Sequence, residues 1–260
     1  MTLVFFKRLY LPLFILITTL FLSSCASRQD LVYFQDADKE IELSVKYVLT
    51  YKPDDLITIS VSALDMDAVR PFNLYVAAFR GTAGGITSTP SLQTYLIDAT
   101  GNIDFPVIGT VPIGGLSRKE ATRLVTDKLH PYIKDPIVNI RITNFKISVL
   151  GEVNAPGTFN IPNERVTLPE ALGLARDLKI QGRRANILII REVDGKITKN
   201  YIDLRTNALF SSPFYYLQQN DVVYVEPNNS RIKESRVNPN TGIFLSSVSI
   251  LISLLAILTR

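Results

Sequence analysis

Four aspartates lie close together in the sequence, at Asp54-Asp55, Asp65 and Asp67. Two carboxylates flanking a sugar linkage are the groups that cleave a glycosidic bond. Adjacent strand residues point to opposite faces, however, and aspartates in turns are usually solvated or cap helices. His130, the one histidine, is predicted in a helix's last turn, where a cation suits the dipole. A single cysteine provides no CxxC metal site and no disulfide framework. We therefore expect no enzyme activity, no catalytic residues, no metal and no cofactor.

Cys25 is the only cysteine, and it follows a leader with the parts of a secretory signal. Residues 1–24 hold a short basic region, an apolar stretch and then small residues. The ending Leu22-Ser23-Ser24-Cys25 resembles a bacterial lipobox, in which the thiol is acylated and cleavage makes the cysteine residue one. No Asp follows Cys25, so the common inner-membrane retention signal is missing. The sequence thus predicts a signal peptide over 1–24 and lipidation at Cys25; the alternative is a retained membrane helix.

The composition permits one or two domains with real cores, because the chain has 260 residues and is 47% hydrophobic. The formal net charge is +4, and two of the positive charges lie in the leader. The remainder is nearly balanced, so we do not expect nucleic-acid binding.

Hydrophobic periodicity and capping signals predict two small α+β units that meet near Phe145. Ser117 and Glu120 form a capping box that opens a helix over 116–132, and Thr167 with Glu170 opens a shorter second helix. Strands are predicted over 47–62 with a break at 53–55, then within 95–112, and over 137–143, 146–152, 187–191, 199–204 and 221–226. Residues 80–94, rich in Gly, Ser and Thr, are predicted to be a loop, and Gly157 is expected to take a positive φ in a tight turn.

Four stretches in this order resemble the outer-membrane polysaccharide export family. They are Y-K-P-D-D-L-I-T-I-S-V from Tyr51, G-N-I-D-F-P-V-I-G-T-V-P-I-G-G-L-S-R-K-E-A from Gly101, I-S-V-L-G-E-V-N-A-P-G-T-F from Ile147 and Q-N-D-V-V-Y-V-E-P from Gln219. The last two are similar to the opening and closing strands of a soluble-ligand-binding β-grasp domain. The resemblance covers roughly residues 47–228.

The resemblance implies an outer-membrane lipoprotein with most of the chain in the periplasm. Members assemble into rings, commonly octamers, through which capsular polysaccharide or exopolysaccharide leaves the cell. Their inner-membrane partner is a polysaccharide co-polymerase or tyrosine kinase. The predicted organisation is a signal peptide at 1–24, a tether at 25–46, an export domain at 47–145, a β-grasp domain at 146–228, a linker at 229–241 and a transmembrane helix at 242–259.

The chain departs from the family pattern in several places. The turn usually reads Pro-Gly-Asp, whereas here it is Pro53-Asp54-Asp55, with Asp55 as the matching carboxylate. The second helix usually ends in Ala-Gly-Gly, but Arg176 and Asp177 follow Ala175. Longer members carry two or more β-grasp units, and this chain has room for one.

The uncharged stretch at 242–258 is about 17 residues long, near the lower limit for a bilayer crossing. Ser246, Ser249 and Ser253 fall on one stripe of a helix, and apolar residues line the opposite face. A small polar stripe suits a helix that lines an oligomeric pore. The alternatives are a simple anchor and a buried terminal helix.

Arg176, Lys179, Arg183 and Arg184 form a basic cluster after the second helix. We predict that they contact an acidic polymer or a neighbouring subunit; the alternative is a solvated face. The leading hypothesis is polysaccharide export through an oligomeric channel. The alternative is a non-channel periplasmic or surface glycan-binding lipoprotein.

Overall fold

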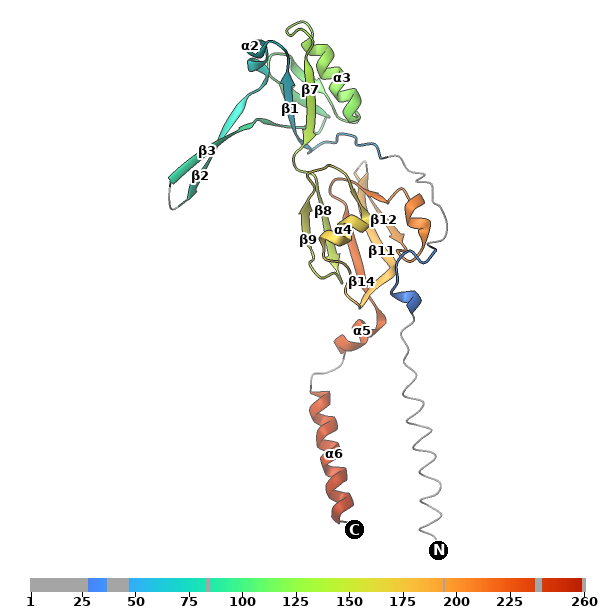
Figure 1. The fold of residues 1–260 in the computed structure, drawn as a ribbon. Helices are drawn as coiled ribbons and strands as arrows, with labels where there is room; N and C mark the ends of the chain where they lie inside the picture. The colour runs from blue at the N-terminus through green and yellow to red at the C-terminus, as the bar shows by residue number, and fades with distance from the viewer. Residues whose placement is uncertain (1–27, 37–46, 83–84, 194, 237–239, 259–260) are drawn as a thin grey trace.

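The computed structural model describes residues 28–36, 47–82, 85–193, 195–236 and 240–258. Two α+β domains follow one another, and helices α5 (Asn229–Arg236) and α6 (Thr241–Leu258) extend from the second (Figure 1). This agrees with the α+β class predicted from the sequence. The predicted signal peptide and Cys25 lie outside the described residues.

The first domain is built on a three-stranded antiparallel sheet of order β4-β1-β7. β1 (Leu56–Ser62) is its central strand, between β4 (Thr94–Leu96) and β7 (Ile137–Ile142). Helix α3 (Arg118–Leu129) packs against β7. The helix forms here because Ser117 and Glu120 make the predicted capping box, and its buried side chains, Ala121, Val125 and Leu129, recur at helical spacing. The remaining elements are α2 (Met66–Val69), η2 (Arg70–Phe72), β5 (Asn102–Phe105) and β6 (Gly109–Pro112).

The predicted loop at 80–94 was wrong. Residues 80–82 and 85–92 belong to a long hairpin of β2 (Tyr75–Thr82) and β3 (Gly85–Leu92), paired in register from Tyr75 opposite Leu92 to Thr82 opposite Gly85. Its Thr and Ile residues favour strands, and this preference outweighs the Gly and Ser content. The hairpin projects away from the first domain (Figure 1).

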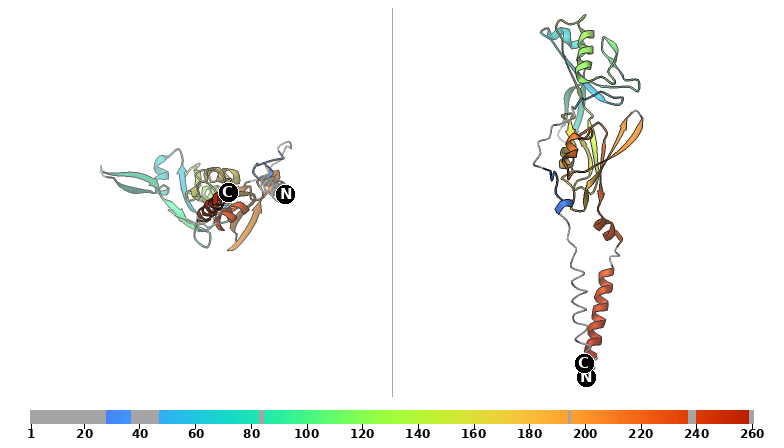
Figure 2. Two further views of the ribbon diagram at one scale, coloured as in Figure 1. Left: turned by 90° about the horizontal axis from the view of Figure 1, so that it is seen from below. Right: turned by 90° about the vertical axis from the view of Figure 1, so that its right-hand side faces the viewer.

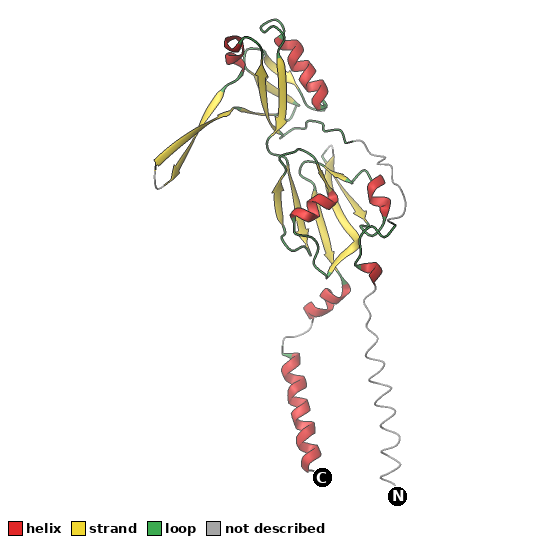
Figure 3. Ribbon diagram, in the orientation of Figure 1, coloured by secondary structure: helices red, strands yellow, loops and turns green. Residues whose placement is uncertain are grey.

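The second domain has a five-stranded sheet of order β12-β11-β14-β8-β9. Only the β14–β8 pair is parallel among its neighbouring strands. The strands are β8 (Lys146–Gly151), β9 (Gly157–Asn160), β11 (Gly182–Val193), β12 (Lys196–Ile202) and β14 (Val222–Pro227). Helix α4 (Leu168–Leu174) lies over one face, as Figure 3 shows, and the predicted Thr167–Glu170 capping box opens it. Two short strands, β10 (Val166–Thr167) and β13 (Tyr216–Leu217), pair beside it, with η3 (Asn207–Ser211) preceding β13.

The expected positive φ at Gly157 was also wrong, since Gly157 simply begins β9. The constrained glycine is Gly151, at the end of β8, with φ +91. It lies so close to β14 that a Cβ there would be 2.1 Å from the carbonyl oxygen of Val225. The turn after β8 therefore depends on the absence of a side chain at 151.

Helix α6 begins at Thr241 and ends at Leu258, close to the predicted bounds of 242–259. Among the described residues, however, none of the helices has both the length and the apolar character that a membrane crossing requires. The predicted transmembrane helix is therefore not supported.

Gly151→Ala is expected to destabilise the chain by about 2–4 kcal/mol, because the new Cβ meets backbone and the φ is strained. Denaturant unfolding followed by circular dichroism measures the loss. Gly173→Ala in α4 is the matched control, since nothing lies within 4 Å of its Cβ position. The control should be neutral or slightly stabilising, and equal losses in the two variants would contradict the close approach.

Candidate functional sites at the domain junction and the docked N-terminal segment

The four aspartates do not form a shared site. Asp54 and Asp55 precede β1, whereas Asp65 and Asp67 follow it. Asp65 caps α2 by accepting the backbone N–H groups of Asp67 and Ala68. Since β1 separates the two pairs, the arrangement does not place carboxylates on both sides of one bond.

Asp55 is a buried carboxylate at the junction of the two domains. It is 2% exposed and accepts the backbone N–H of Lys52 at 2.8 Å. Burial raises the pKa of Asp55 to about 6, although the hydrogen bond from Lys52 opposes this shift. Asp54 has a φ of +68, which explains why glycine is usual at this position. Aspartate tolerates this conformation better than most residues.

His130 forms the C-cap of α3, as predicted, and is exposed. Across the described ranges, no group of three or more His, Cys, Asp or Glu residues is arranged to hold a metal ion.

The junction itself is held by a carboxylate that the sequence analysis missed. Glu164, in the loop after β9, is 4% exposed and has a φ of +55. Its carboxylate accepts the backbone N–H of Ile142 in β7 at 2.5 Å and pairs with the Arg118 guanidinium at the start of α3. Its backbone carbonyl accepts the Tyr47 hydroxyl. One residue of the second domain thus binds three elements of the first. No local signal marks it, because its partners are distant in sequence.

Amide side chains close the same junction. The Asn144 Oδ1 accepts the backbone N–H of Leu56 at 2.9 Å, and Gln219 bonds both the Asn144 carbonyl and the Lys146 N–H at 2.8 Å. Lys52 donates to the Gln218 side chain at 2.8 Å. These bonds join the linker around Phe145 to the turn before β14, so the two domains share a polar as well as an apolar contact.

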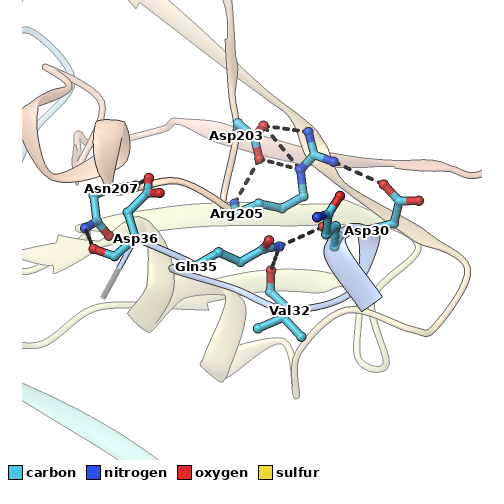
Figure 4. A network of polar contacts seen from close by, with 8 residues as sticks. Asp30, Val32, Gln35, Asp36, Asp203, Arg205 and Asn207 are labelled. Atoms are coloured by element: carbon cyan, nitrogen blue, oxygen red, sulfur yellow. Dashed lines mark hydrogen bonds and ion pairs between the residues drawn. The ribbon is translucent and has the colours of Figure 1, made fainter. Parts of the chain in front are cut away.

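Part of the predicted tether is docked on the second domain. Residues 28–36 contain η1 (Arg28–Asp30), and the backbone N–H groups of Phe34 and Gln35 donate to the carbonyls of Leu204 and Arg205. Figure 4 shows Arg205 between two carboxylates, at 2.9 Å from Asp203 and 3.1 Å from Asp30.

Aromatic contacts reinforce this docking. The Tyr33 hydroxyl donates to Asp177 at 2.7 Å, and burial raises the pKa of this tyrosine well above its usual range. The Phe34 ring lies 5.3 Å from that of Phe210 in η3. The segment is thus fixed by backbone pairing, ion pairs and ring contacts together.

Comparisons with known families match both domains. Residues 44–143 match the polysaccharide biosynthesis/export protein family, and residues 145–225 match the SLBB domain. The chain therefore carries a polysaccharide biosynthesis/export domain followed directly by an SLBB domain. The first domain is hereafter called the export domain, and the second the SLBB domain.

Two relatives carry the same description, "EPS I polysaccharide export outer membrane protein EpsA". The protein from Ralstonia solanacearum is 26% identical over 188 residues, which are 68% of this chain and 49% of that relative. The protein from Ralstonia nicotianae (strain ATCC BAA-1114 / GMI1000) is 32% identical over 89 residues, which are 33% of this chain and 23% of that relative. The chain therefore spans about half the length, or less, of these relatives.

Most of the four basic residues predicted as contact residues have partners within the SLBB domain. Arg184 is buried and donates to the carbonyls of Lys179, Ile180 and Gly182. Lys179 lies 3.8 Å from Glu152, and Arg183 lies 3.3 Å from Glu226. Arg176 is exposed beside them. Three of the four side chains thus have partners within the SLBB domain, and contact with an acidic polymer or a neighbouring subunit stays a prediction.

The predicted serine stripe lies on α6, where all three positions are exposed. Ser246 and Ser253 donate their hydroxyl protons to the carbonyls of Gly242 and Ser249, at 2.8 and 2.9 Å. These two hydroxyls offer acceptor lone pairs to a neighbour, because their protons are used within the helix.

The free energy of unfolding of the Asp55→Asn variant is expected to rise relative to that of the parent chain as pH rises. Asp55 binds its proton more tightly when folded, so it favours folding below its unfolded pKa near 3.8, and this contribution is lost as pH rises through about 6. Asn is neutral throughout, so its advantage should grow by up to ~3 kcal/mol between pH 4 and pH 7.5. Urea unfolding at several pH values tests this, with the exposed Asp54→Asn as control. A stability difference that stays constant with pH would rule out the raised pKa.

Arg205→Ala is expected to loosen the docked segment. The loss of both ion pairs should speed hydrogen exchange at the Phe34 and Gln35 amides by about 3–10-fold. Mass spectrometry of exchange reads this directly. Arg123→Ala, which removes an exposed ion pair with Asp127 on α3, is the matched control. If exchange at 34 and 35 is the same in both variants, Arg205 does not hold the segment.

Proposed function

We propose that this protein exports a polysaccharide across the outer membrane as a lipid-anchored ring of identical copies. The observation that carries the proposal is an export domain followed directly by an SLBB domain, in a chain similar to two relatives described as polysaccharide export outer membrane proteins. The secretory leader and the lipobox ending at Cys25 support export and acylation. In this arrangement the two domains lie in the periplasm.

Helix α6 supports assembly into a ring. Large apolar side chains are exposed on the helix surface outside the serine stripe, and they include Ile243, Phe244, Ile250, Leu251 and Ile257. An exposed apolar helix surface of this kind has to be covered. The α6 helices of neighbouring copies are the cover that we propose, with Ser246, Ser249 and Ser253 facing the axis of the ring.

The proposal includes a partner in the inner membrane, of the polysaccharide co-polymerase or tyrosine kinase type. The β2–β3 hairpin projects sideways from the export domain, as the left-hand view of Figure 2 also indicates, and this domain is the one remote from α6. We assign this hairpin to the partner contact. We propose no enzymatic step, because the described carboxylates act as caps and junction groups.

A second candidate is a glycan-binding lipoprotein that forms no channel. In this candidate the SLBB domain acts on its own as a glycan-binding module. The two candidates differ in whether copies must assemble.

Native mass in mild detergent separates them. The intact lipidated chain is expected to give one discrete mass, a multiple of the subunit, and Ile250→Asp should reduce it to the monomer by placing a charge in the α6 contact. Ile197→Asp on β12 is the matched control, because Ile250 and Ile197 are similarly exposed at 61% and 69%. In cells that lack the parent gene, Ile250→Asp should abolish polymer export and Ile197→Asp should retain it. A monomeric parent chain would favour the glycan-binding candidate.

A further inference from the structure

A cleft opens between the export domain and the SLBB domain, beside the Glu164 clamp. Its volume is about 660 Å³, and both domains line it: Tyr47, Arg118 and Lys119 on one side, and Asn163, Arg165 and Glu170 on the other. This size is within the range of small-ligand sites in proteins.

The cleft holds cations whose charge is not consumed by the fold. In the part of the chain that the structure describes, neither Lys119 nor Arg165 forms an ion pair, and both are exposed. Arg118 is neutralised by Glu164, and the Glu170 carboxylate accepts the backbone N–H and hydroxyl of Thr167. With Arg118, Lys119 and Arg165 set against Glu164 and Glu170, the lining of the cleft carries one excess positive charge.

Arg165 is also held in place. Its guanidinium carbon lies 5.6 Å from the centre of the Tyr216 ring, and that ring packs against Tyr47 at 5.2 Å. A guanidinium stacked on an aromatic face keeps its N–H groups free for an anion. Tyr47 and the 63%-exposed Val48 add apolar surface at the same place.

We propose that this cleft binds an anionic sugar unit of the exported polymer. Lys119 and Arg165 pair with the carboxylate or phosphate of the sugar, and the apolar surface of Tyr47 and Val48 contacts the sugar ring. This inference rests on the proposed function, and it adds that the polymer carries acidic sugars. Because the cations are exposed, we expect a dissociation constant on the order of 1 mM. Weak binding suits a conduit, which has to release what it binds.

The test uses saturation-transfer NMR on the full chain with three probes: oligogalacturonate, glucose 1-phosphate, and a neutral malto-oligosaccharide of the same length as the oligogalacturonate. At least one acidic probe should bind, the neutral one should not, and binding should weaken as salt rises. Arg165→Gln and Lys119→Gln should each weaken it at least 5-fold, while Arg165→Lys should restore part of it. Arg123→Gln is the control, an exposed cation on the same helix as Lys119.

Two outcomes would overturn the proposal. One is equal binding of acidic and neutral probes, or none at all, by the folded chain. The other is a change of native mass in Arg165→Gln with unchanged sugar binding, which would make the cleft a contact between copies. Failure of the proposed function reads differently: cells lacking the gene would still export polymer, although the purified chain bound the acidic probe.

Discussion

The arrangement of the two domains depends on the Glu164 carboxylate at their junction. A buried carboxylate is stable only when it is paired and hydrogen-bonded. Among the described residues, the Glu164 carboxylate meets this condition through the other domain, with the Ile142 N–H and the Arg118 guanidinium. The charge therefore penalises any separation of the domains. The cleft depends on the same contact, because Lys119 and Arg165 come from opposite sides of it.

The sequence was sufficient to predict the elements whose formation depends on residues close together in the chain. Both capping boxes form, since each needs only residues three positions apart. The alternating stretch at 137–143 became β7, with every second residue buried. The hairpin at 75–92 was missed because composition was given more weight than pairing, and its partner strands show only in the fold. Glu164 was missed for the same reason.

The basic residues show that a sequence alone does not reveal which positive charges are available for binding. Clustering along the chain pointed to residues 176–184, but the fold brings Glu152 to Lys179 and Glu226 to Arg183 as ion-pair partners. Lys119 and Arg165 are 46 positions apart by number and look unrelated in the sequence. The fold places them in one cleft, where no carboxylate of the described residues forms an ion pair with either of them. Whether a charged side chain is available to bind a ligand thus depends on its ion pairs, and tertiary structure determines those pairs.

The docked segment constrains where a membrane can lie. Residues 28–36 and α5 both lie at the end of the SLBB domain remote from the export domain (Figure 1). Cys25 precedes Arg28 by three residues, and three residues of chain reach at most about 11 Å. Because η1 and Tyr33 are fixed to the SLBB domain, an acyl chain on Cys25 would hold that domain against the bilayer. A flexible tether would not fix the orientation of the SLBB domain relative to the bilayer. A docked one, with an acyl chain on Cys25, would direct the export domain away from the lipid, toward the partner that we propose.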